Sequence, residues 1–255
     1  MPLFDTHAHY DDPAFDSDRA DILSALPENG VCAVLDPGCD AESSRRAAAL
    51  AAQYPFVYAA VGWQPENVAD FSEASLDLLR ELAKQPKVVA IGEIGLDYYW
   101  EQNPPRALQQ QAFRSQLALA RELGLPVIVH DREAHGDCLA MIREYPQVRG
   151  VFHCFSGSAE MARELLALGW YLGFDGPVTY KNARKALEVA AICPADRILF
   201  ETDSPYLPPV PLRGTRNDSR NLHLIAEKLA EVRGEAPEAL IEQTAHNART
   251  LFRIG

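Results

Sequence analysis

The feature that most constrains this chain is a repeat of short apolar runs, each followed by a longer stretch with helical spacing. Eight runs rich in Val, Ile, Leu and Phe occur in order, at residues 3–9, 31–38, 57–64, 88–97, 126–131, 150–156, 170–175 and 198–204. Runs that are apolar almost throughout are typical of strands buried on both faces, as in a parallel sheet covered by helices. Residues 107–123 and 159–168 carry apolar side chains at helical intervals. The sequence therefore predicts alternating strands and helices.

The number of strand–helix units indicates how the sheet is arranged. Eight units in 255 residues fit the size of a closed (β/α)8 TIM barrel, which has about 250 residues. An open doubly wound sheet is the alternative. No linker or shift in composition divides the chain, so we expect one α/β domain over residues 1–255. Residues 204–219 are rich in proline and predict a long ordered loop, and residues 237–252 predict a closing helix.

Charge and composition exclude some classes of protein. The chain has 24 Lys and Arg against 36 Asp and Glu, a formal net charge of −12, which disfavours a surface that coats long nucleic-acid duplexes. It still permits a small site where metal ions neutralise one or two phosphates. We find neither an apolar stretch near the roughly 20 residues of a membrane span nor a secretory leader, so we expect a cytoplasmic protein. The five cysteines lack Cys-x-x-Cys spacing and are expected to be reduced thiols.

Polar residues recur at the carboxyl ends of the predicted strands. In a (β/α)8 barrel these ends converge on the face that carries the active site. We therefore expect a single shared pocket. The residues at these positions are His9, Asp36, Gln64, Glu93, His130, His153, Asp175 and Asp203.

Three of these positions are histidines, and with His7 they make four, which together with the carboxylates Glu93 and Asp203 predict a metal site. His7 and His9 are two residues apart on an extended segment, so both imidazoles point the same way. A single histidine at a strand end is more often a hydrogen-bonded packing residue. Together with Glu93 and Asp203, however, the imidazoles form a donor set that suits Zn²⁺, Mn²⁺ or Mg²⁺.

Five motifs in order carry a resemblance to a known family. They are Phe4-Asp5-Thr6-His7-Ala8-His9, Gly92-Glu93-Ile94-Gly95-Leu96-Asp97-Tyr98, Val129-His130, His153-Cys154-Phe155-Ser156-Gly157 and Glu201-Thr202-Asp203-Ser204-Pro205-Tyr206-Leu207. The chain resembles the TatD-family metal-dependent deoxyribonucleases from residue 4 to the tail at 247–252. That resemblance implies a TIM barrel of the metallo-dependent hydrolase type, related to the amidohydrolases.

The resemblance also implies two adjacent divalent ions, Mg²⁺, Mn²⁺ or Zn²⁺. His7, His9 and Asp203 would hold one ion, His130 and His153 the other, and Glu93 would bridge them. Many amidohydrolase relatives have a carbamylated lysine at the bridging position. Glu93 in its place favours the TatD branch over hydantoinase- or dihydroorotase-like chemistry.

The implied reaction is hydrolysis of DNA phosphodiester bonds by a metal-activated water, with Glu93 and Asp203 as the catalytic carboxylates. Asp203 would orient the water and accept its proton, or would serve as a ligand alone. Because a recessed barrel mouth admits a strand end more easily than a duplex, we expect single-stranded ends as the substrate. The activity we expect is that of a 3′–5′ exonuclease. We expect a monomer that neither binds a membrane nor requires an obligate protein partner.

Three arginines and one tyrosine are predicted substrate contacts. Arg132 lies two residues past His130, and Arg213 and Arg216 lie in the loop after the eighth strand, where barrel enzymes often bind phosphate. Arginine forks match phosphate oxygens, and solvated surface arginines are the alternative. Tyr98 is a candidate for stacking on a base, although aromatic residues at a barrel mouth more often serve packing. Tyr99, Trp100 and Trp63 are further candidates.

Departures from the family pattern and several remaining residues complete the expectations. Residues 213–217 match the family's Arg-Gly-x-Arg-Asn loop, but Asp218-Ser219-Arg220 follow where an acidic residue and a proline are usual. Strand alternation predicts that the Cys154 thiol points toward the helices, away from the site. We expect the remaining histidines to be structural or solvated: His135, His223 and His246.

Two other functions remain open. The same centre could cleave an ester or amide, for example as a D-aminoacyl-tRNA deacylase, and the sequence does not separate that reaction from phosphodiester cleavage. A metal-binding barrel without catalysis is the third possibility. The presence of competent residues at all six ligand positions argues against it.

Overall fold

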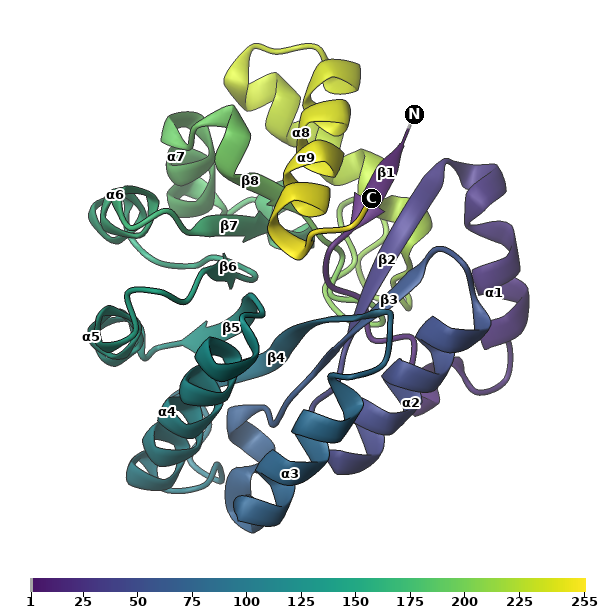
Figure 1. Cartoon of the computed structure of the whole chain (residues 1–255). Coiled ribbons are helices and arrows are strands. Elements are labelled where there is room, and N and C mark those ends of the chain that lie inside the picture. Colours follow the sequence, from purple (N-terminus) through teal and green to yellow (C-terminus); the bar gives the residue numbers. More distant parts are fainter. Residues whose placement is uncertain (1) are drawn as a thin grey trace.

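The computed structural model describes residues 2–255, in which eight parallel strands form a barrel (Figure 1). Each strand pairs with the next in the sequence, in the order β1 to β8. This confirms the predicted (β/α)8 architecture and excludes the doubly wound alternative. The strands are β1 (Leu3–Asp5), β2 (Val31–Pro37), β3 (Val57–Val61), β4 (Val88–Asp97), β5 (Val127–Arg132), β6 (Gly150–Phe152), β7 (Tyr171–Phe174) and β8 (Ile198–Phe200).

Helices surround the strands, as Figure 1 shows. Both helical stretches singled out in the sequence are found within a residue of their expected bounds, and the expected closing helix has the expected bounds. The helices are α1 (Arg19–Ala25), α2 (Ala41–Gln53), α3 (Glu73–Leu82), α4 (Arg106–Leu123), α5 (His135–Glu144), α6 (Ala159–Ala167), α7 (Arg184–Ile192), α8 (Leu222–Arg233) and α9 (Pro237–Phe252). Within residues 2–255, no helix combines the length and apolar character needed to cross a bilayer.

The seam between the last strand and the first lies beside the predicted site. The Thr6 amide donates to the Phe200 carbonyl at 3.0 Å, and the Asp203 amide donates to the His7 carbonyl at 2.8 Å. A parallel bridge between Ala8 and Ser204 continues this pairing. The prediction that His7 and His9 lie on the first strand was wrong: β1 ends at Asp5, and both histidines follow it.

Apolar side chains fill two layers, which follows from the alternation of strand residues. One cluster lies between the strands and the surrounding helices. The other collects residues such as Phe4, Leu35, Ile128 and Leu199 from different strands, together with Phe252 and other residues of α9. Because α9 packs on this second cluster, the predicted ligands at the carboxyl ends of the strands are left to form the open end of the barrel.

Gly95 allows close approach of two strands beside one predicted ligand. It has φ +143°, and a Cβ at this position would lie 2.0 Å from the His130 carbonyl oxygen. Few other residues adopt this backbone conformation. Glycine here therefore lets β4 pair with β5 in the register that places Gly95 opposite His130.

Candidate metal centre

The first two histidines converge as the sequence predicts. Although they follow β1, the Nε2 atoms of His7 and His9 lie 3.1 Å apart. The Nδ1 atom of His9 lies 3.1 Å from the Pro37 carbonyl oxygen, so this nitrogen is placed to donate, which leaves a lone pair on Nε2. Both rings are buried. Two imidazole nitrogens at this separation are best accommodated by a proton or a cation between them.

Glu93 lies at the centre of the cluster, and its two carboxylate oxygens face different histidines. Oε1 is 2.7 Å from His130 Nδ1 and 2.8 Å from His153 Nε2. Oε2 is 3.5 Å from His7 Nε2 and 3.7 Å from His9 Nε2. The side chain is 1% exposed. Each oxygen is thus oriented toward its own pair of imidazoles.

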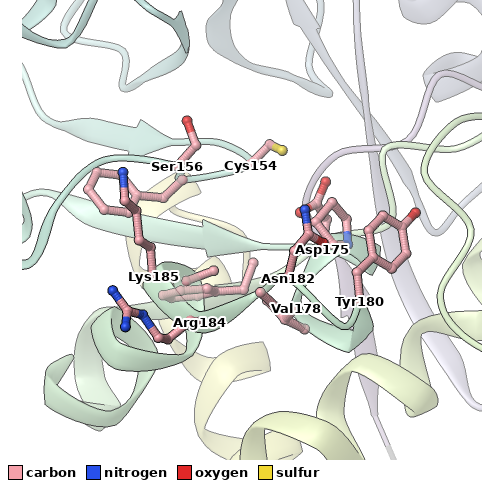
Figure 2. Close-up of a pocket in the computed structure, with 13 residues that line it drawn as sticks. Cys154, Ser156, Asp175, Val178, Tyr180, Asn182, Arg184 and Lys185 are labelled. Carbon is pink, nitrogen blue, oxygen red and sulfur yellow. The ribbon is translucent and has the colours of Figure 1, made fainter.

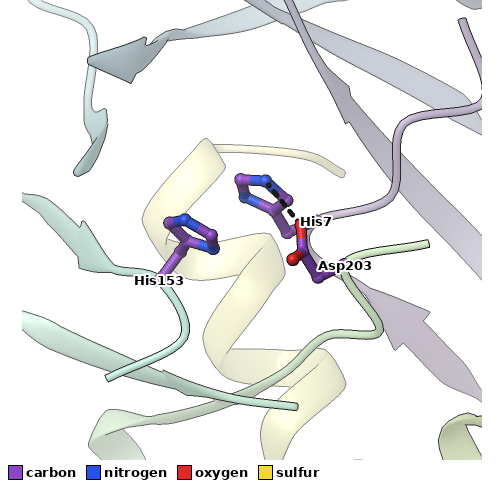
Figure 3. Close-up of side chains that lie close together, drawn as sticks. All are labelled: His7, His153 and Asp203. Atoms are coloured by element: carbon purple, nitrogen blue, oxygen red, sulfur yellow. Dashed lines mark ion pairs between the residues drawn. The ribbon is translucent and has the colours of Figure 1, made fainter. Parts of the chain in front are cut away.

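Asp203 lies at the edge of the cluster nearest the mouth. Its Oδ1 atom is 3.6 Å from His7 Nε2 and 3.5 Å from His9 Nε2, and its side chain is 15% exposed. The residue has φ 54° and turns the chain directly after β8. Figure 3 shows Asp203 beside the ring of His7, with His153 facing that ring. The stacked His7 and His153 rings have centroids 3.9 Å apart.

Two carboxylates that the sequence analysis did not select contact His130 and His153 at the ring nitrogens that do not face Glu93. Asp97 Oδ2 lies 3.1 Å from His130 Nε2, and Glu201 Oε1 lies 3.6 Å from His153 Nδ1. Glu201 also accepts from the Cys154 amide. Both residues belong to the quoted motifs, at the end of β4 and two residues before Asp203. Their even spacing from a selected carboxylate was the signal that could have identified them.

The electrostatics fit a site that binds cations. Burial opposes ionisation of Glu93, but the imidazoles of His153, His130 and His7 outweigh it and hold the pKa of Glu93 well below its usual range. Burial raises the pKa of Asp203, but the hydrogen bond from His9 and the charge of His7 outweigh burial and hold this pKa below its usual value. Burial lowers the pKa of His130, but Asp97 and Glu93 outweigh it and raise that pKa to about 9.

The donor chemistry and the spacing both suit divalent metal ions. Of the groups of side chains that offer ligand atoms within 4.8 Å of one another, three consist of predicted ligands only: His7, His9 and Glu93; Glu93, His130 and His153; and His7, His153 and Asp203. Imidazole nitrogens combined with carboxylate oxygens are typical ligands of such ions. The six predicted ligands therefore form one cluster with the composition that a metal centre requires.

A cavity of about 290 Å³ leads to the cluster. His130, His153 and Asp203 line it, and so does Arg132. The Arg132 guanidinium lies 4.1 Å from the ring centre of Tyr99 and 5.2 Å from that of Trp100. Tyr99 is 51% and Trp100 42% exposed. The structure thus places this arginine at the mouth, beside two exposed aromatic rings.

The other predicted substrate residues lie elsewhere. Arg213 packs over the Tyr180 ring at 4.4 Å. Arg216 pairs with Asp18 at 2.6 Å and lies over the Phe15 ring, so its guanidinium is already engaged. The Tyr98 hydroxyl donates to Asp137 at 2.7 Å, and Arg106 covers the Tyr98 ring at 4.1 Å. Tyr98 is therefore held against α4 and α5, and the face of its ring that Arg106 covers is not available to a base.

The expectation for Cys154 was wrong. Strand β6 ends at Phe152 and Cys154 has φ 44°, so strand alternation does not extend to it. Cys154 lines the mouth cavity with His153 and Asp203. Burial, together with the charges of Asp175 and Asp203, raises the pKa of its thiol well above the usual value. The thiol stays protonated, which argues against a nucleophilic role.

The remaining aromatic residue and histidines have ordinary surroundings. Trp63 is 3% exposed and donates to Asp70 at 3.3 Å, so it packs in the core and is not available for stacking. His135 pairs with Asp131 at 2.9 Å. His223 and His246 are exposed on α8 and α9.

A barrel with histidines and carboxylates gathered at the carboxyl ends of its strands defines a metal-dependent hydrolase. The sequence pattern of the TatD related DNase family matches residues 4–253. The chain belongs to this family, as the resemblance predicted.

Individual relatives agree with this assignment. The chain is 42% identical over 254 residues to the uncharacterized metal-dependent hydrolase YabD of Bacillus subtilis, covering 99% of both chains. It is 39% identical to the 3′-5′ ssDNA/RNA exonuclease TatD of Cronobacter sakazakii, covering 98% of this chain and 97% of that one. The crystal structure of YjjV, a TatD homologue from Escherichia coli, superposes with a TM-score of 0.93 at 33% identity, covering 99% and 98% of the two chains.

Proposed function

We propose that the protein is a two-metal phosphodiesterase that shortens single-stranded nucleic acid from its 3′ end. The observation that carries the proposal is the position of Glu93, whose two oxygens each face a separate pair of imidazoles. Two-metal centres suit phosphodiester cleavage because they neutralise the attacking and leaving oxygens together. The exonuclease relative from Cronobacter sakazakii, with 39% identity, supports the choice of substrate.

The proposed ligands divide as the carboxylate geometry suggests. His7, His9 and Asp203 would hold one ion, and His130 and His153 the other, with Glu93 between them. Mg²⁺, Mn²⁺ and Zn²⁺ are the candidate ions. When bound, such ions supply Lewis acidity toward the phosphoryl group and lower the pKa of water.

The side chains of this protein then have distinct tasks. Asp203, the more exposed of the two carboxylates, would orient the attacking water and accept its proton. Asp97 and the Pro37 carbonyl fix the orientations of the His130 and His9 rings. Arg132 lies at the mouth, where its fork can bind a phosphate oxygen of the strand.

The substrate form follows from the size of the opening. A mouth cavity of about 290 Å³ suits a single strand end better than a duplex. Arg213 is a second candidate phosphate contact, whereas Arg216 would have to exchange Asp18 for a phosphate. We further propose that the chain acts as a single-domain monomer in the cytoplasm.

The test uses single-stranded oligonucleotides labelled at the 3′ or the 5′ end, with Mg²⁺, Mn²⁺ or EDTA. Stepwise shortening from the 3′ end by the wild type, and its loss in EDTA and in Glu93→Gln, is the expected result. Glu227→Gln, an exposed substitution on α8, is the matched control and should remain active. If neither oligonucleotide is cut although ions are bound, the phosphodiesterase proposal fails. Release of an amino acid from D-aminoacyl-tRNA would then be measured.

A further inference from the structure

A second cavity, of about 400 Å³, lies beside the mouth. It is formed by the loop after β6 and the segment from β7 to the start of α7 (Figure 2). Cys154, Ser156 and Pro177 line both this cavity and the mouth cavity. A molecule whose reacting bond lies at the metal ligands can therefore extend into it without leaving the surface of the protein.

The inner part of this second cavity carries an unpaired polar group. Asp175 is 2% exposed, and its Oδ2 atom has no hydrogen-bond partner among residues 2–255. A buried polar atom without a partner is costly. Since Asp175 lines the cavity (Figure 2), a ligand with a polar ring edge could satisfy this oxygen.

The walls and rim offer an aromatic ring and positive charge. Tyr180 lines the cavity, and its hydroxyl is fixed by the Pro208 carbonyl at 3.0 Å. Arg184 and Lys185 lie at the outer side and are exposed. In the part of the chain that is described, neither side chain makes a hydrogen bond or ion pair. Two free cations at one cavity of a chain with a net charge of −12 indicate an anionic ligand.

We propose that this cavity binds the penultimate nucleotide of the strand, the one that lies just inside the scissile phosphate. Arg213, which does not line the cavity, covers one face of the Tyr180 ring at 4.4 Å, so the base packs against the other face with a polar edge at Asp175, and its second phosphate lies at Lys185. We assign the cavity to the penultimate nucleotide because this nucleotide has a phosphate on each side. One phosphate would lie at the metal ligands and the other at Lys185. The inference rests on the proposed function.

Lys185 is tested by neutralising the phosphate that it would contact. A methylphosphonate replaces the second internucleotide phosphate from the cleaved end, and kcat/KM is compared with that of the unmodified strand. We expect about a tenfold loss for the wild type and little further loss in Lys185→Gln, whose activity on the unmodified strand is already lower. Lys181→Gln removes the same charge from an exposed neighbour outside the cavity and should behave as the wild type.

Tyr180 is tested by removing the base. An abasic residue at the penultimate position should lower kcat/KM of the wild type by about tenfold, a range expected for one stacked base. The loss should nearly disappear in Tyr180→Ala and persist in Tyr180→Phe, which keeps the ring. Circular dichroism spectra of the variants show whether each remains folded.

The outcomes separate the two proposals. If the wild type cuts no unmodified strand, the proposed function fails and this inference fails with it. If it cuts the strand, but the methylphosphonate costs wild type and Lys185→Gln equally, the nuclease stands and the nucleotide subsite is wrong. Equal abasic losses in wild type and Tyr180→Ala overturn the subsite in the same way.

Discussion

Asp97 Oδ2 lies 3.1 Å from His130 Nε2, on the side of the ring opposite Glu93, whose Oε1 lies 2.7 Å from Nδ1. The imidazole is therefore fixed between two carboxylates. Hydrogen bonds of this kind orient a metal-binding histidine and raise its basicity. Asp97 is thus a positioning residue in the proposed centre, acting through His130.

The first prediction concerns this positioning. Asp97→Asn should weaken metal binding by about 10- to 100-fold, because the His130 ring loses its charged partner. Isothermal titration with Mn²⁺ measures the affinity directly, and excess Mn²⁺ should restore part of the activity. Asp77→Asn, on the exposed face of α3, is the control. Unchanged affinity in Asp97→Asn would show that Asp97 does not act through His130.

The second prediction separates two roles of Asp203. Asp203→Asn should lower kcat by about 10²- to 10⁴-fold, the usual contribution of a general base, while KM changes little. Metal content measured on the same sample decides between the roles. Near wild-type turnover at full metal occupancy would exclude the proton-transfer role. Loss of metal in proportion to activity would leave Asp203 as a ligand alone.

The third prediction concerns pH. The pKa of His130 in the metal-free protein is raised to about 9 by Asp97 and Glu93 against the effect of burial, so its ring is protonated at pH 7. An ion that binds there displaces this proton. Because the pKa values of the ligands His9 and His153 are raised as well, affinity should rise by at least about tenfold per pH unit as the pH increases toward 9. Calorimetry in two buffers with different ionisation enthalpies measures the proton release. Absence of release at pH 7 would contradict the prediction.

The fourth prediction compares two arginines. Arg132→Gln should raise KM for an oligonucleotide about tenfold, because this guanidinium lines the mouth. Arg216→Gln should change KM less, because Arg216 is paired with Asp18. Steady-state kinetics at two salt concentrations checks both, since a lost phosphate contact also reduces the dependence on salt. A larger effect of Arg216→Gln would place that loop over the substrate.

The fifth prediction uses two glycines with positive φ. Gly95→Ala should destabilise the fold by about 3 kcal/mol or more, because the added Cβ would meet the His130 carbonyl. Gly124→Ala, with φ +66° and no atom within 4 Å of the added Cβ, should cost only about 1–2 kcal/mol. Urea denaturation of both variants measures the difference. Equal costs would mean that the contact with β5 relaxes freely.

The sequence by itself determined the architecture and the histidines and carboxylates that gather at the open end of the barrel. Because strands and helices have different periods of apolar residues, the sequence pattern alone indicates that strands and helices alternate. Parallel strands bring their carboxyl ends together, so His7, Glu93, His130 and Asp203 could be assigned to one pocket from their places at strand ends. These are consequences of local pattern and simple topology.

Only the tertiary structure decided contacts that depend on how the chain turns after each strand. The positive φ of Cys154 reverses the direction expected from alternation. Arg216 meets Asp18, almost 200 residues away in the sequence, and Asp97 meets His130 across neighbouring strands. Such contacts depend on backbone turns and on pairing between distant segments. The residue pattern of a single strand or loop therefore cannot predict these contacts.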